Sequence, residues 1–481
     1  MDGGGGGGGG HVLLLPYPSQ GHVHPMLQFA KRLAFHGMRS TLVVTRYILG
    51  TRAPDVAGAE VRVVAISDGC DAGGFGECGV DGGGGVTAYI ARLEAAGSET
   101  LGELLRDEAA RGQPVRAVVY DAFLPWARAV AQRHGAAAAA FFTQPCAVNV
   151  VYGHVWCNRV GVPVKTGATV ALPGLPALER DGLPWFLKVG PGPYPAYFET
   201  VMRQFDGLEQ ADDVLVNSSY ELEPEEAAYM ASAWRAKTIG PTVPAAYLGD
   251  DRLPADTKYG FHLFELTTAP CMEWLDAHPP RSVVFVSFGS LSDLDPAEMR
   301  EVAHGLLDAG RPFLWAVRSS ESHKLPAGYE SACAPRGLVV SWCPQLEVLA
   351  HPAVGCFLTH CGWNSTAEAL VAGVPMVALP QWTDQPMNAQ YVETVWRVGV
   401  RVRPAAADGL ARRDEVERGI EEVMVGERSG EYRCNAAGWM EKAKAASLEG
   451  GSSDRNIAEF VAKYAAAKCN CEMDGTSQAP A

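Results

Sequence analysis

The chain has 481 residues, of which 47% are hydrophobic and 20% are charged, an ordinary globular composition. Its formal net charge of −15 argues against nucleic acid or an anionic membrane as a partner, because both require a basic protein face. No apolar run approaches the roughly 20 residues that span a bilayer, so no membrane partner is expected. The length predicts two or three domains of roughly 150 residues each.

The N-terminus and the cysteines indicate the compartment. Met1 and Asp2 precede eight glycines, without the basic region and apolar stretch of a secretion signal. The twelve cysteines are scattered and no pair forms C-x-x-C, which favours reduced thiols over a disulfide framework. We therefore expect a cytoplasmic protein, and we expect it to act as a monomer.

Short apolar runs alternate with helical patterns through the first half of the chain. Such alternation predicts an α/β fold with a doubly wound parallel sheet. The predicted helices are residues 25–36, 86–105 and 126–134. The predicted strands are residues 12–15, 40–44, 61–66, 115–120, 136–142 and, as the last strand of this half, 214–217.

A second alternating series follows a polar stretch rich in Asp and Pro, at residues 241–268, that predicts a linker. The series consists of strands 283–287, 313–317 and 337–341, helix 298–308, and closing helices 414–424 and 456–467. The resulting division is a disordered glycine tract (1–10), a first domain (11–245), a linker (246–270), a second domain (271–455), a C-terminal helix (456–468) and a flexible tail (469–481).

Residues 356–370 predict a strand, a tight polar turn and the start of a helix. The turn gathers His360, Gly362, Asn364 and Ser365 where unpaired backbone N–H groups and the positive end of the helix dipole attract an anion. Glu368 lies one turn into the helix, where a carboxylate can accept hydrogen bonds from ribose hydroxyls. The segment therefore predicts a bound nucleotide diphosphate.

Two polar residues end predicted strands of the first half. His22 lies in the turn after strand 12–15, where side chains face the ligand crevice of such a sheet, and imidazole can act as a general base near neutral pH. A structural role at the start of the helix is the alternative. Asp121 can fix the tautomer of a base histidine, or it can cap the helix near Trp126.

Strand 283–287 ends in a turn where Ser290 can donate to a phosphate and Gly289 allows close approach. Two glycine fingerprints, at residues 3–10 and 74–79, do not directly follow a predicted strand, as a dinucleotide site requires. This weakens the interpretation of the chain as a dehydrogenase. Asp293 and Asp295 formally match a metal-binding D-x-D. Asp295 with the proline after it is typical of a helix start, so no metal is expected.

Residues 342–385 closely resemble the 44-residue signature box of plant secondary-product glycosyltransferases, the UDP-sugar-dependent enzymes of glycosyltransferase family 1. The resemblance covers nearly all of the chain and implies GT-B, a fold of two facing Rossmann-like domains whose last helix crosses back to the first. The box residues that match are Trp342, Gln345, His360, Trp363, Asn364, Ser365, Glu368, Asp384 and Gln385.

The resemblance also implies roles for individual residues. His22 would remove the proton of the acceptor and Asp121 would be its partner. UDP-glucose would be the co-substrate, without a cofactor, and Gln385 at the end of the box would favour glucose. The implied donor-binding residues are Thr143, Ser290, Trp342, Cys343, Gln345, His360, Gly362, Trp363, Asn364, Ser365, Glu368, Asp384 and Gln385.

The implied reaction is an inverting transfer of glucose to a hydroxyl or carboxyl group of a small hydrophobic plant metabolite of secondary metabolism, giving a β-glucoside or a glucose ester. Use of UDP-galactose or UDP-glucuronate, or a non-catalytic UDP-sugar-binding role, is the alternative. The sequence does not identify the acceptor. Candidate acceptor-binding residues, which packing explains equally well, are Tyr17, Phe123, Phe142, Phe198, Met202 and Trp382.

Overall fold

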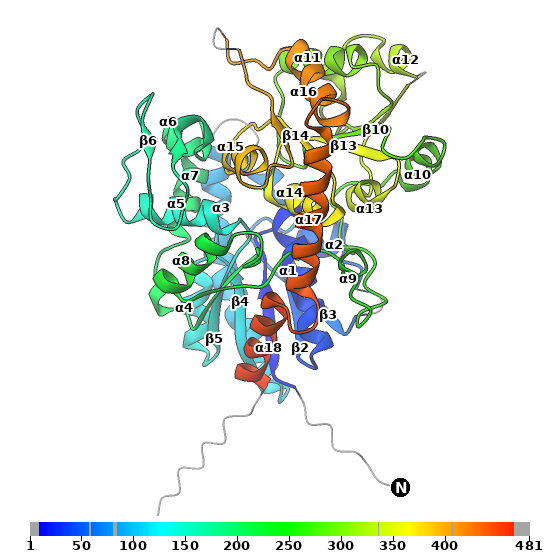
Figure 1. Ribbon diagram of the computed structural model, residues 1–481. Helices are drawn as coiled ribbons and strands as arrows, with labels where there is room; N and C mark the ends of the chain where they lie inside the picture. Colours follow the sequence, from blue (N-terminus) through cyan, green and yellow to red (C-terminus); the bar gives the residue numbers. More distant parts are fainter. Residues whose placement is uncertain (1–8, 57–58, 80–83, 335, 406–407, 466–481) are drawn as a thin grey trace, which may run out of the picture.

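The computed structural model describes residues 9–56, 59–79, 84–334, 336–405 and 408–465. Two parallel sheets, each covered by helices, form the two halves of the molecule (Figure 1). The prediction of an α/β fold with parallel sheets is confirmed. No helix in these ranges combines the length and the apolar character that a membrane span requires.

The first sheet has seven strands in the order β3-β2-β1-β4-β5-β8-β9. Every neighbouring pair is parallel, and β1 (HVLLL) is buried along its whole length, as expected for a strand covered on both faces. The strands are β1 (His11–Leu15), β2 (Arg39–Thr45), β3 (Val61–Ile66), β4 (Val115–Asp121), β5 (Ala137–Phe142), β8 (Asp213–Val216) and β9 (Ala236–Thr238).

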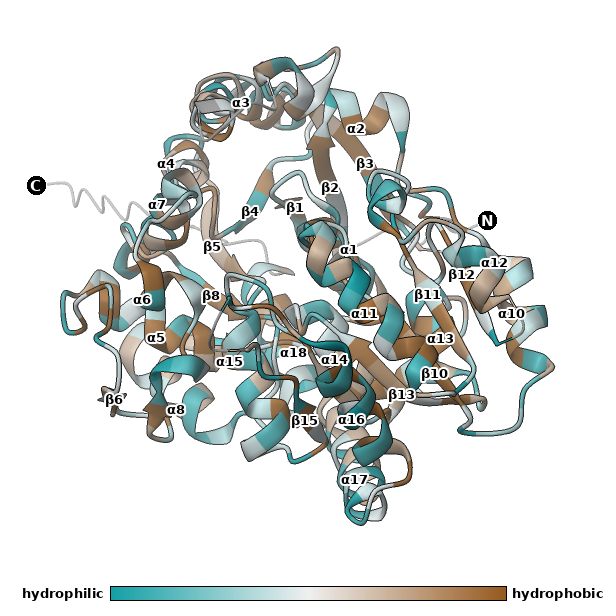
Figure 2. Cartoon of the chain, turned by 90° about the horizontal axis from the view of Figure 1, so that it is seen from above, coloured by the Kyte–Doolittle hydropathy of each residue, from teal (hydrophilic) through white to brown (hydrophobic). Residues whose placement is uncertain are grey.

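The second sheet has six parallel strands in the order β12-β11-β10-β13-β14-β15. Figure 2 shows brown, hydrophobic strands in the interior of the molecule and teal positions on the helices around them. The strands are β10 (Val283–Ser287), β11 (Phe313–Ala316), β12 (Gly337–Val340), β13 (Val354–Thr359), β14 (Met376–Ala378) and β15 (Gly399–Arg401). A separate antiparallel pair joins β6 (Thr169–Val170) and β7 (Leu178–Glu179).

Helices connect the strands. In the first half they are α1 (Gln20–Phe35), α2 (Arg46–Thr51), α3 (Gly84–Ala110), α4 (Trp126–Arg133), α5 (Cys146–Trp156), α6 (Trp185–Val189), α7 (Pro195–Arg203), α8 (Pro224–Trp234) and α9 (Ala245–Leu248), with a short 3₁₀ turn, η1 (Gly74–Cys78). In the second half they are α10 (Thr268–Asp276), α11 (Pro296–Asp308), α12 (Tyr329–Cys333), α13 (Gln345–Ala350), α14 (Trp363–Ala372), α15 (Gln385–Gln390), η5 (Tyr391–Val395), α16 (Arg413–Met424), α17 (Ser429–Ser447) and α18 (Ser452–Ala465).

The prediction that strand 214–217 closes the first sheet is wrong, because β9 pairs beyond β8 at the sheet edge. β9 has three residues, AKT, and its central Lys237 is only partly buried. So short and polar a strand carries no apolar run that a sequence pattern can detect. The rest of the predicted strands of this sheet agree with the structure to within a residue at each end.

The segment expected to link the halves packs closely on α1. Lys31 Nζ contacts Asp256 Oδ1 at 2.7 Å with both side chains buried, and the His24 ring stacks on Tyr259 with centroids 4.2 Å apart. His24 Nε2 also lies 2.5 Å from the Phe261 carbonyl oxygen. His24 therefore holds this segment against α1, while the exact domain boundaries stay a prediction.

Helix α18 lies on the first sheet, packed against α1 and β9. Phe460 is 2% exposed, and its ring centroid lies 5.8 Å from that of Phe29 and 4.7 Å from that of Tyr464. The C-terminal helix therefore completes the core beneath β1 and α1 (Figure 1).

Phe460→Ala is expected to lower the free energy of unfolding by about 3–5 kcal/mol, because it removes a buried ring from this core. Glu459→Ala is the matched control on the same helix, since it removes only an exposed ion pair with Lys237 and is expected to cost less than about 1 kcal/mol. Urea unfolding of both variants measures the difference. Equal stability of the two would show that α18 adds little to the core.

Candidate active site

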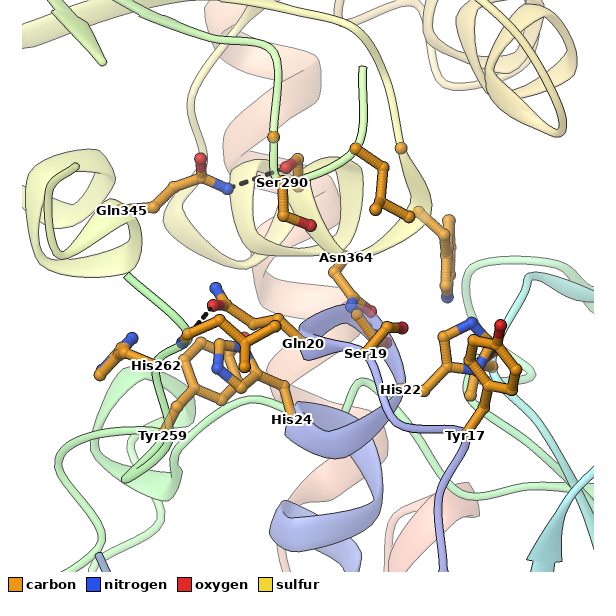
Figure 3. A pocket seen from close by; sticks show the side chains of 18 of the residues that line it. Tyr17, Ser19, Gln20, His22, His24, Tyr259, His262, Ser290, Gln345 and Asn364 are labelled. Atoms are coloured by element: carbon orange, nitrogen blue, oxygen red, sulfur yellow. Dashed lines mark hydrogen bonds between the residues drawn. The ribbon is translucent and has the colours of Figure 1, made fainter. Parts of the chain in front are cut away.

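The carboxyl ends of the two sheets enclose one cavity of about 540 Å³. Its lining comes from the turns after β1, β2, β3, β4 and β5 on one side and after β10, β12, β13 and β14 on the other. Figure 3 shows Tyr17 and His22 reaching into the cavity from the first half, and Ser290 and Gln345 from the second. This is the crevice where open parallel sheets bind ligands.

His22 and Asp121 meet beneath the cavity. His22 Nδ1 lies 2.6 Å from Asp121 Oδ2, and the Asp121 side chain is almost wholly buried. The backbone N–H groups of Tyr17 and Phe123 donate to the same carboxylate at 3.2 and 3.0 Å. A carboxylate so placed accepts the Nδ1 proton, which leaves Nε2 of the imidazole as the nitrogen able to take a proton. Asp121 does not cap α4, whose N-cap is Pro125 without a side-chain bond.

Aromatic rings hold the imidazole in place. The His22 ring centroid lies 5.3 Å from Tyr17 and 4.9 Å from Phe123. Thr143 Oγ1 lies 3.4 Å from His22 Nδ1, and all four residues line the cavity. The arrangement restricts the orientation of the imidazole, as a positioned base requires.

The opposite side of the cavity is built for an anion. Gly362 is the N-cap of α14 and provides no side-chain cap, so the first N–H groups of the helix are unsatisfied by the helix itself. The His360 ring fits between Gly289 and Gly362, where an added Cβ would come within 2.7 and 2.5 Å of the ring. Burial lowers the pKa of His360 to about 4, so at neutral pH the imidazole is neutral and carries one N–H that can act as a donor. Ser290 also lines this side.

A hydrogen-bonded group on α13 and α14 forms the next part of the wall. Gln345 Nε2 donates to Ser365 Oγ at 2.8 Å and to Glu368 Oε2 at 2.6 Å. Glu368 is buried, and burial raises its pKa to about 7. The Gln345 amide therefore holds the Glu368 carboxylate in place, and when ionised this carboxylate can accept a hydrogen bond from a hydroxyl group in the cavity. Trp342 and Cys343, which precede α13, line the same region.

The end of the signature box carries two fixed polar side chains. Asp384 accepts from Thr383 Oγ1 and Asn388 Nδ2, each at 2.7 Å, and burial raises its pKa. Gln385 Oε1 accepts from the backbone N–H groups of Gln381 and Trp382 at 2.9 and 3.1 Å. These two donors fix the orientation of the Gln385 amide. The amide oxygen is bound to the backbone of the turn, and the NH₂ group can still donate to a ligand.

Two box residues also join the halves of the molecule. Trp363 Nε1 donates to the Asn217 carbonyl at 2.6 Å, and Asn364 Nδ2 donates to the Gly21 carbonyl at 2.8 Å. Both residues line the cavity. Their side chains are therefore part of the contact between the halves as well as of the predicted donor site.

Three candidate acceptor residues lie outside the cavity. Phe142 is fully buried against Phe205, Phe198 packs on Phe186, and Met202 packs against the same core. Phe142 belongs to strand β5 itself, and the cavity is lined by Thr143 and Gln144 just beyond it. Tyr17, Phe123 and Trp382 do line the cavity, and Trp382 contacts the rings of Tyr194 and Tyr197.

Several lining residues were missed by sequence reasoning. Tyr47 and Asp68 follow strands β2 and β3 closely, so the rule that strand ends face the crevice could have found them. The others come from helices or from distant loops and carry no such signal. They include Phe75, Tyr89, Tyr197, Val201, Tyr259 and His262. Ser19 and Gln20 lie in the turn after β1, so the strand-end rule could have found them too.

The two aspartates of the D-x-D match are engaged elsewhere. Asp293 pairs with Lys324, and Asp295 Oδ1 caps α11 by accepting from the Ala297 N–H at 2.7 Å. Neither lines the cavity. Among the residues described, no group of three or more His, Cys, Asp or Glu side chains is arranged to hold a metal ion.

Comparisons with known proteins agree with this geometry. Residues 267–428 match the sequence model of the family described as UDP-glucoronosyl and UDP-glucosyl transferase. The chain is 53% identical to the barley UDP-glucosyltransferase UGT13248 (Hordeum vulgare subsp. vulgare) over 94% of each chain. It is 46% identical to UDP-glycosyltransferase 74F2 of Arabidopsis thaliana over 94% of this chain and 98% of the relative.

The fold matches solved structures over the same range. A crystal structure of the rice protein Os79 in complex with UDP superposes with a TM-score of 0.89 at 54% identity, covering 94% of this chain and 100% of the rice chain. Both halves of the molecule, and thus the two sheets that enclose the cavity, fall within the matched range. The chain belongs to the plant UDP-glycosyltransferases of glycosyltransferase family 1, and its fold is GT-B.

Proposed function

We propose that this enzyme transfers glucose from UDP-glucose to a hydroxyl group of a small hydrophobic plant metabolite, with inversion at the anomeric carbon. The observation that carries the proposal is the His22–Asp121 pair, which faces the anion-binding end of α14 across a single cavity. A base and a leaving-group site on opposite sides of one cavity suit an in-line displacement.

The donor is proposed to bind the second half. The diphosphate would lie at the N-terminus of α14, where unpaired N–H groups, Ser290 and the neutral His360 supply donors. The ribose hydroxyls would bond to the Glu368 carboxylate, and the sugar would reach Asp384 and Gln385. The rice structure that contains UDP supports a UDP-sugar donor for its relative here.

In the proposed reaction, His22 Nε2 removes the proton of the acceptor hydroxyl as its oxygen attacks the anomeric carbon. Asp121 stabilises the imidazolium that forms. The bond to the diphosphate breaks on the opposite face of the sugar, and UDP departs. An α-linked donor gives a β-linked product by this route. The negative charge of the departing diphosphate is stabilised by fixed N–H dipoles, and we propose that neither a metal ion nor a cofactor is used.

The acceptor wall favours a neutral alcohol or phenol. Tyr17, Phe123, Phe75 and Tyr89 give it an aromatic surface, and the buried Asp68 accepts from Tyr89 OH at 2.8 Å. An anionic acceptor would meet the Asp68 carboxylate at short range and be repelled. Glucose ester formation is the second candidate, because one relative at 46% identity is the indole-3-acetate beta-glucosyltransferase of Zea mays.

The remaining expectations are also proposals. We propose that the protein is cytoplasmic and monomeric, and that UDP-glucose is preferred over UDP-galactose and UDP-glucuronate. A non-catalytic role as a UDP-sugar-binding protein is disfavoured, because the base and its carboxylate partner are both in place.

Release of UDP from UDP-glucose with a panel of acceptors tests the function directly. Neutral phenols and terpenoid alcohols are expected to be glucosylated at least about tenfold more efficiently than carboxylic acids of similar size, since only the acids are repelled by Asp68. Preference for the acids would move the assignment to ester formation. No UDP release above donor hydrolysis, with any acceptor, would contradict the transferase assignment.

His22→Ala is expected to reduce transfer to an alcohol by about 10²–10⁴-fold, because general-base loss typically costs this much, while UDP-glucose affinity changes little. Asp121→Asn is expected to lower turnover as well, since the amide cannot stabilise an imidazolium. His323→Ala, at an exposed histidine in the short 3₁₀ helix between β11 and α12, is the control. Wild-type turnover by His22→Ala would remove His22 from the mechanism.

The affinity for UDP-glucose is expected to weaken by up to about tenfold between pH 8 and pH 6, because burial raises the pKa of Glu368 to about 7 and protonation turns one of its acceptor oxygens into a donor. UDP-glucose itself has no group that titrates in this range, and His360 stays neutral throughout. Calorimetric titration of the wild type and of Glu368→Gln measures the effect. A pH dependence that persists in Glu368→Gln would assign it to another group.

UDP-glucose is expected to exceed UDP-galactose by at least about tenfold in kcat/KM, about 1.4 kcal/mol, since a mismatched hydroxyl leaves a buried polar group unpaired. Gln385→Glu keeps the oxygen that binds the backbone of the turn and removes the NH₂ donor, so the preference is expected to shrink below about threefold. Gln132→Glu, at an exposed position on α4, is the control. An unchanged preference would show that another residue selects the sugar.

A further inference from the structure

Two thiols that the proposed reaction does not use meet behind the acceptor wall, in the segment that carries Phe75. Cys70 Sγ and Cys78 Sγ lie 3.5 Å apart. Cys70 is fully buried in the turn after β3, whereas Cys78 is only partly buried at the end of η1. Among the described cysteines, these two are the pair whose sulfur atoms lie within hydrogen-bonding distance.

The chain between the two thiols is a tightly built turn. Asp68 Oδ1 accepts from the Cys70 N–H at 2.9 Å, and the Gly74 N–H donates to the Cys70 carbonyl at 2.8 Å. Glu77 Oε1 accepts from the N–H groups of Ala72 and Gly73 at 2.8 and 2.6 Å. These bonds hold the two sulfur atoms near each other rather than leaving them to chance encounter.

The same turn forms part of the cavity. Gly74 and Phe75 line it, and the Phe75 ring lies 5.4 Å from Tyr89 in an edge-to-face contact. Gly74 packs so closely on Tyr47, another lining residue, that a Cβ would come within 2.6 Å of the Tyr47 ring. A change in the position of Cys78 would therefore be transmitted to the aromatic acceptor wall.

The surroundings give the two thiols different roles. Burial and the neighbouring Cys78 raise the pKa of Cys70 to about 11, while Arg92, whose Nη1 lies 3.7 Å from Cys70 Sγ, acts in the opposite direction. Cys78 is the more accessible thiol and reacts first with a reagent from solvent. Cys70, already in contact with it, is placed to complete the reaction.

We propose that Cys70 and Cys78 form a reversible intramolecular disulfide by exchange with a low-molecular-weight disulfide such as oxidised glutathione, and that this cross-link changes acceptor binding. The effect on acceptor binding rests on the proposed function, whereas the formation of the disulfide does not.

The exchange takes place in two balanced steps. The Cys78 thiolate attacks one sulfur of oxidised glutathione, forming a protein–glutathione disulfide and releasing one glutathione thiolate. Cys70 then loses its proton, attacks the Cys78 sulfur and releases the second glutathione. The two protein thiols lose two electrons in total, and oxidised glutathione gains them as two molecules of reduced glutathione.

The cross-link requires movement in the wall. A disulfide bond is about 2.05 Å long, so the two sulfur atoms must approach by roughly 1.5 Å from their present 3.5 Å. Cys70 is fixed among buried groups, and thus the displacement falls on the η1 turn and on Phe75. The donor site, on the opposite side of the cavity, is not connected to this turn by any of the contacts described above.

The cross-link is tested on the full chain, incubated with oxidised glutathione at pH 8, blocked with N-ethylmaleimide and mapped by peptide mass. A Cys70–Cys78 peptide two hydrogens lighter than its reduced form, restored by dithiothreitol, is expected. Cys78→Ser is expected to abolish it, whereas Cys434→Ser, at an exposed thiol on α17, leaves it unchanged. Alkylation of both thiols, or a glutathione adduct on Cys78 that never resolves, would overturn the proposal.

The consequence is tested by direct titration of an acceptor into reduced and cross-linked enzyme. The acceptor Kd is expected to shift by at least about threefold while the Kd of UDP-glucose stays within about twofold, and Cys78→Ser is expected to show no effect of the oxidant. An unchanged acceptor Kd in the cross-linked enzyme would refute the effect on the wall. A protein that forms the cross-link when oxidised but transfers no glucose when reduced would instead count against the proposed function.

Discussion

The carboxyl ends of two parallel sheets face each other across one cavity, and the remaining features of the site follow from this constraint. Every strand of a parallel sheet ends at the same edge, so side chains far apart in sequence gather there. His22 and Asp121 are 99 positions apart, yet their side chains lie 2.6 Å apart because β1 and β4 are neighbours. The second sheet contributes the N-terminus of α14 by the same rule, at the turn after β13.

The contacts between the halves use residues of the site itself. Trp363 and Asn364 donate to backbone carbonyls of the first half, and Tyr391 OH donates to Glu226 Oε1 at 2.5 Å. A substitution at Asn364 therefore changes both the proposed donor site and the contact between the two halves. A substitution at Gln385 avoids this ambiguity, because the contacts of its side chain described above lie within the second half.

The sequence predicts most strands of both sheets, though not the short β9, β14 and β15, and most of the site, because both depend on local pattern. Apolar runs gave the buried strands, and strand ends gave His22, Asp121 and Ser290. The acceptor side was harder to predict, because its lining comes from helices such as α3 and α7 whose orientation only the packing decides. Phe142 shows that a position next to a lining residue does not predict a lining side chain, because Phe142 adjoins Thr143 in sequence and yet its ring lies in the core. Helix α17 was missed because its buried positions are largely small residues, such as Ala436 and Ala443, which form no apolar stripe.

The central claim is that an acceptor oxygen activated by His22 attacks the sugar from the side opposite the diphosphate. The configuration of the product tests this most directly. Proton NMR of the glucoside formed from UDP-glucose, followed from the first turnover so that later isomerisation is excluded, reports the anomeric configuration through the coupling of the anomeric proton. The account predicts the large diaxial coupling of a β-glucoside. The small coupling of an α-glucoside would show retention and contradict a single displacement with His22 as base.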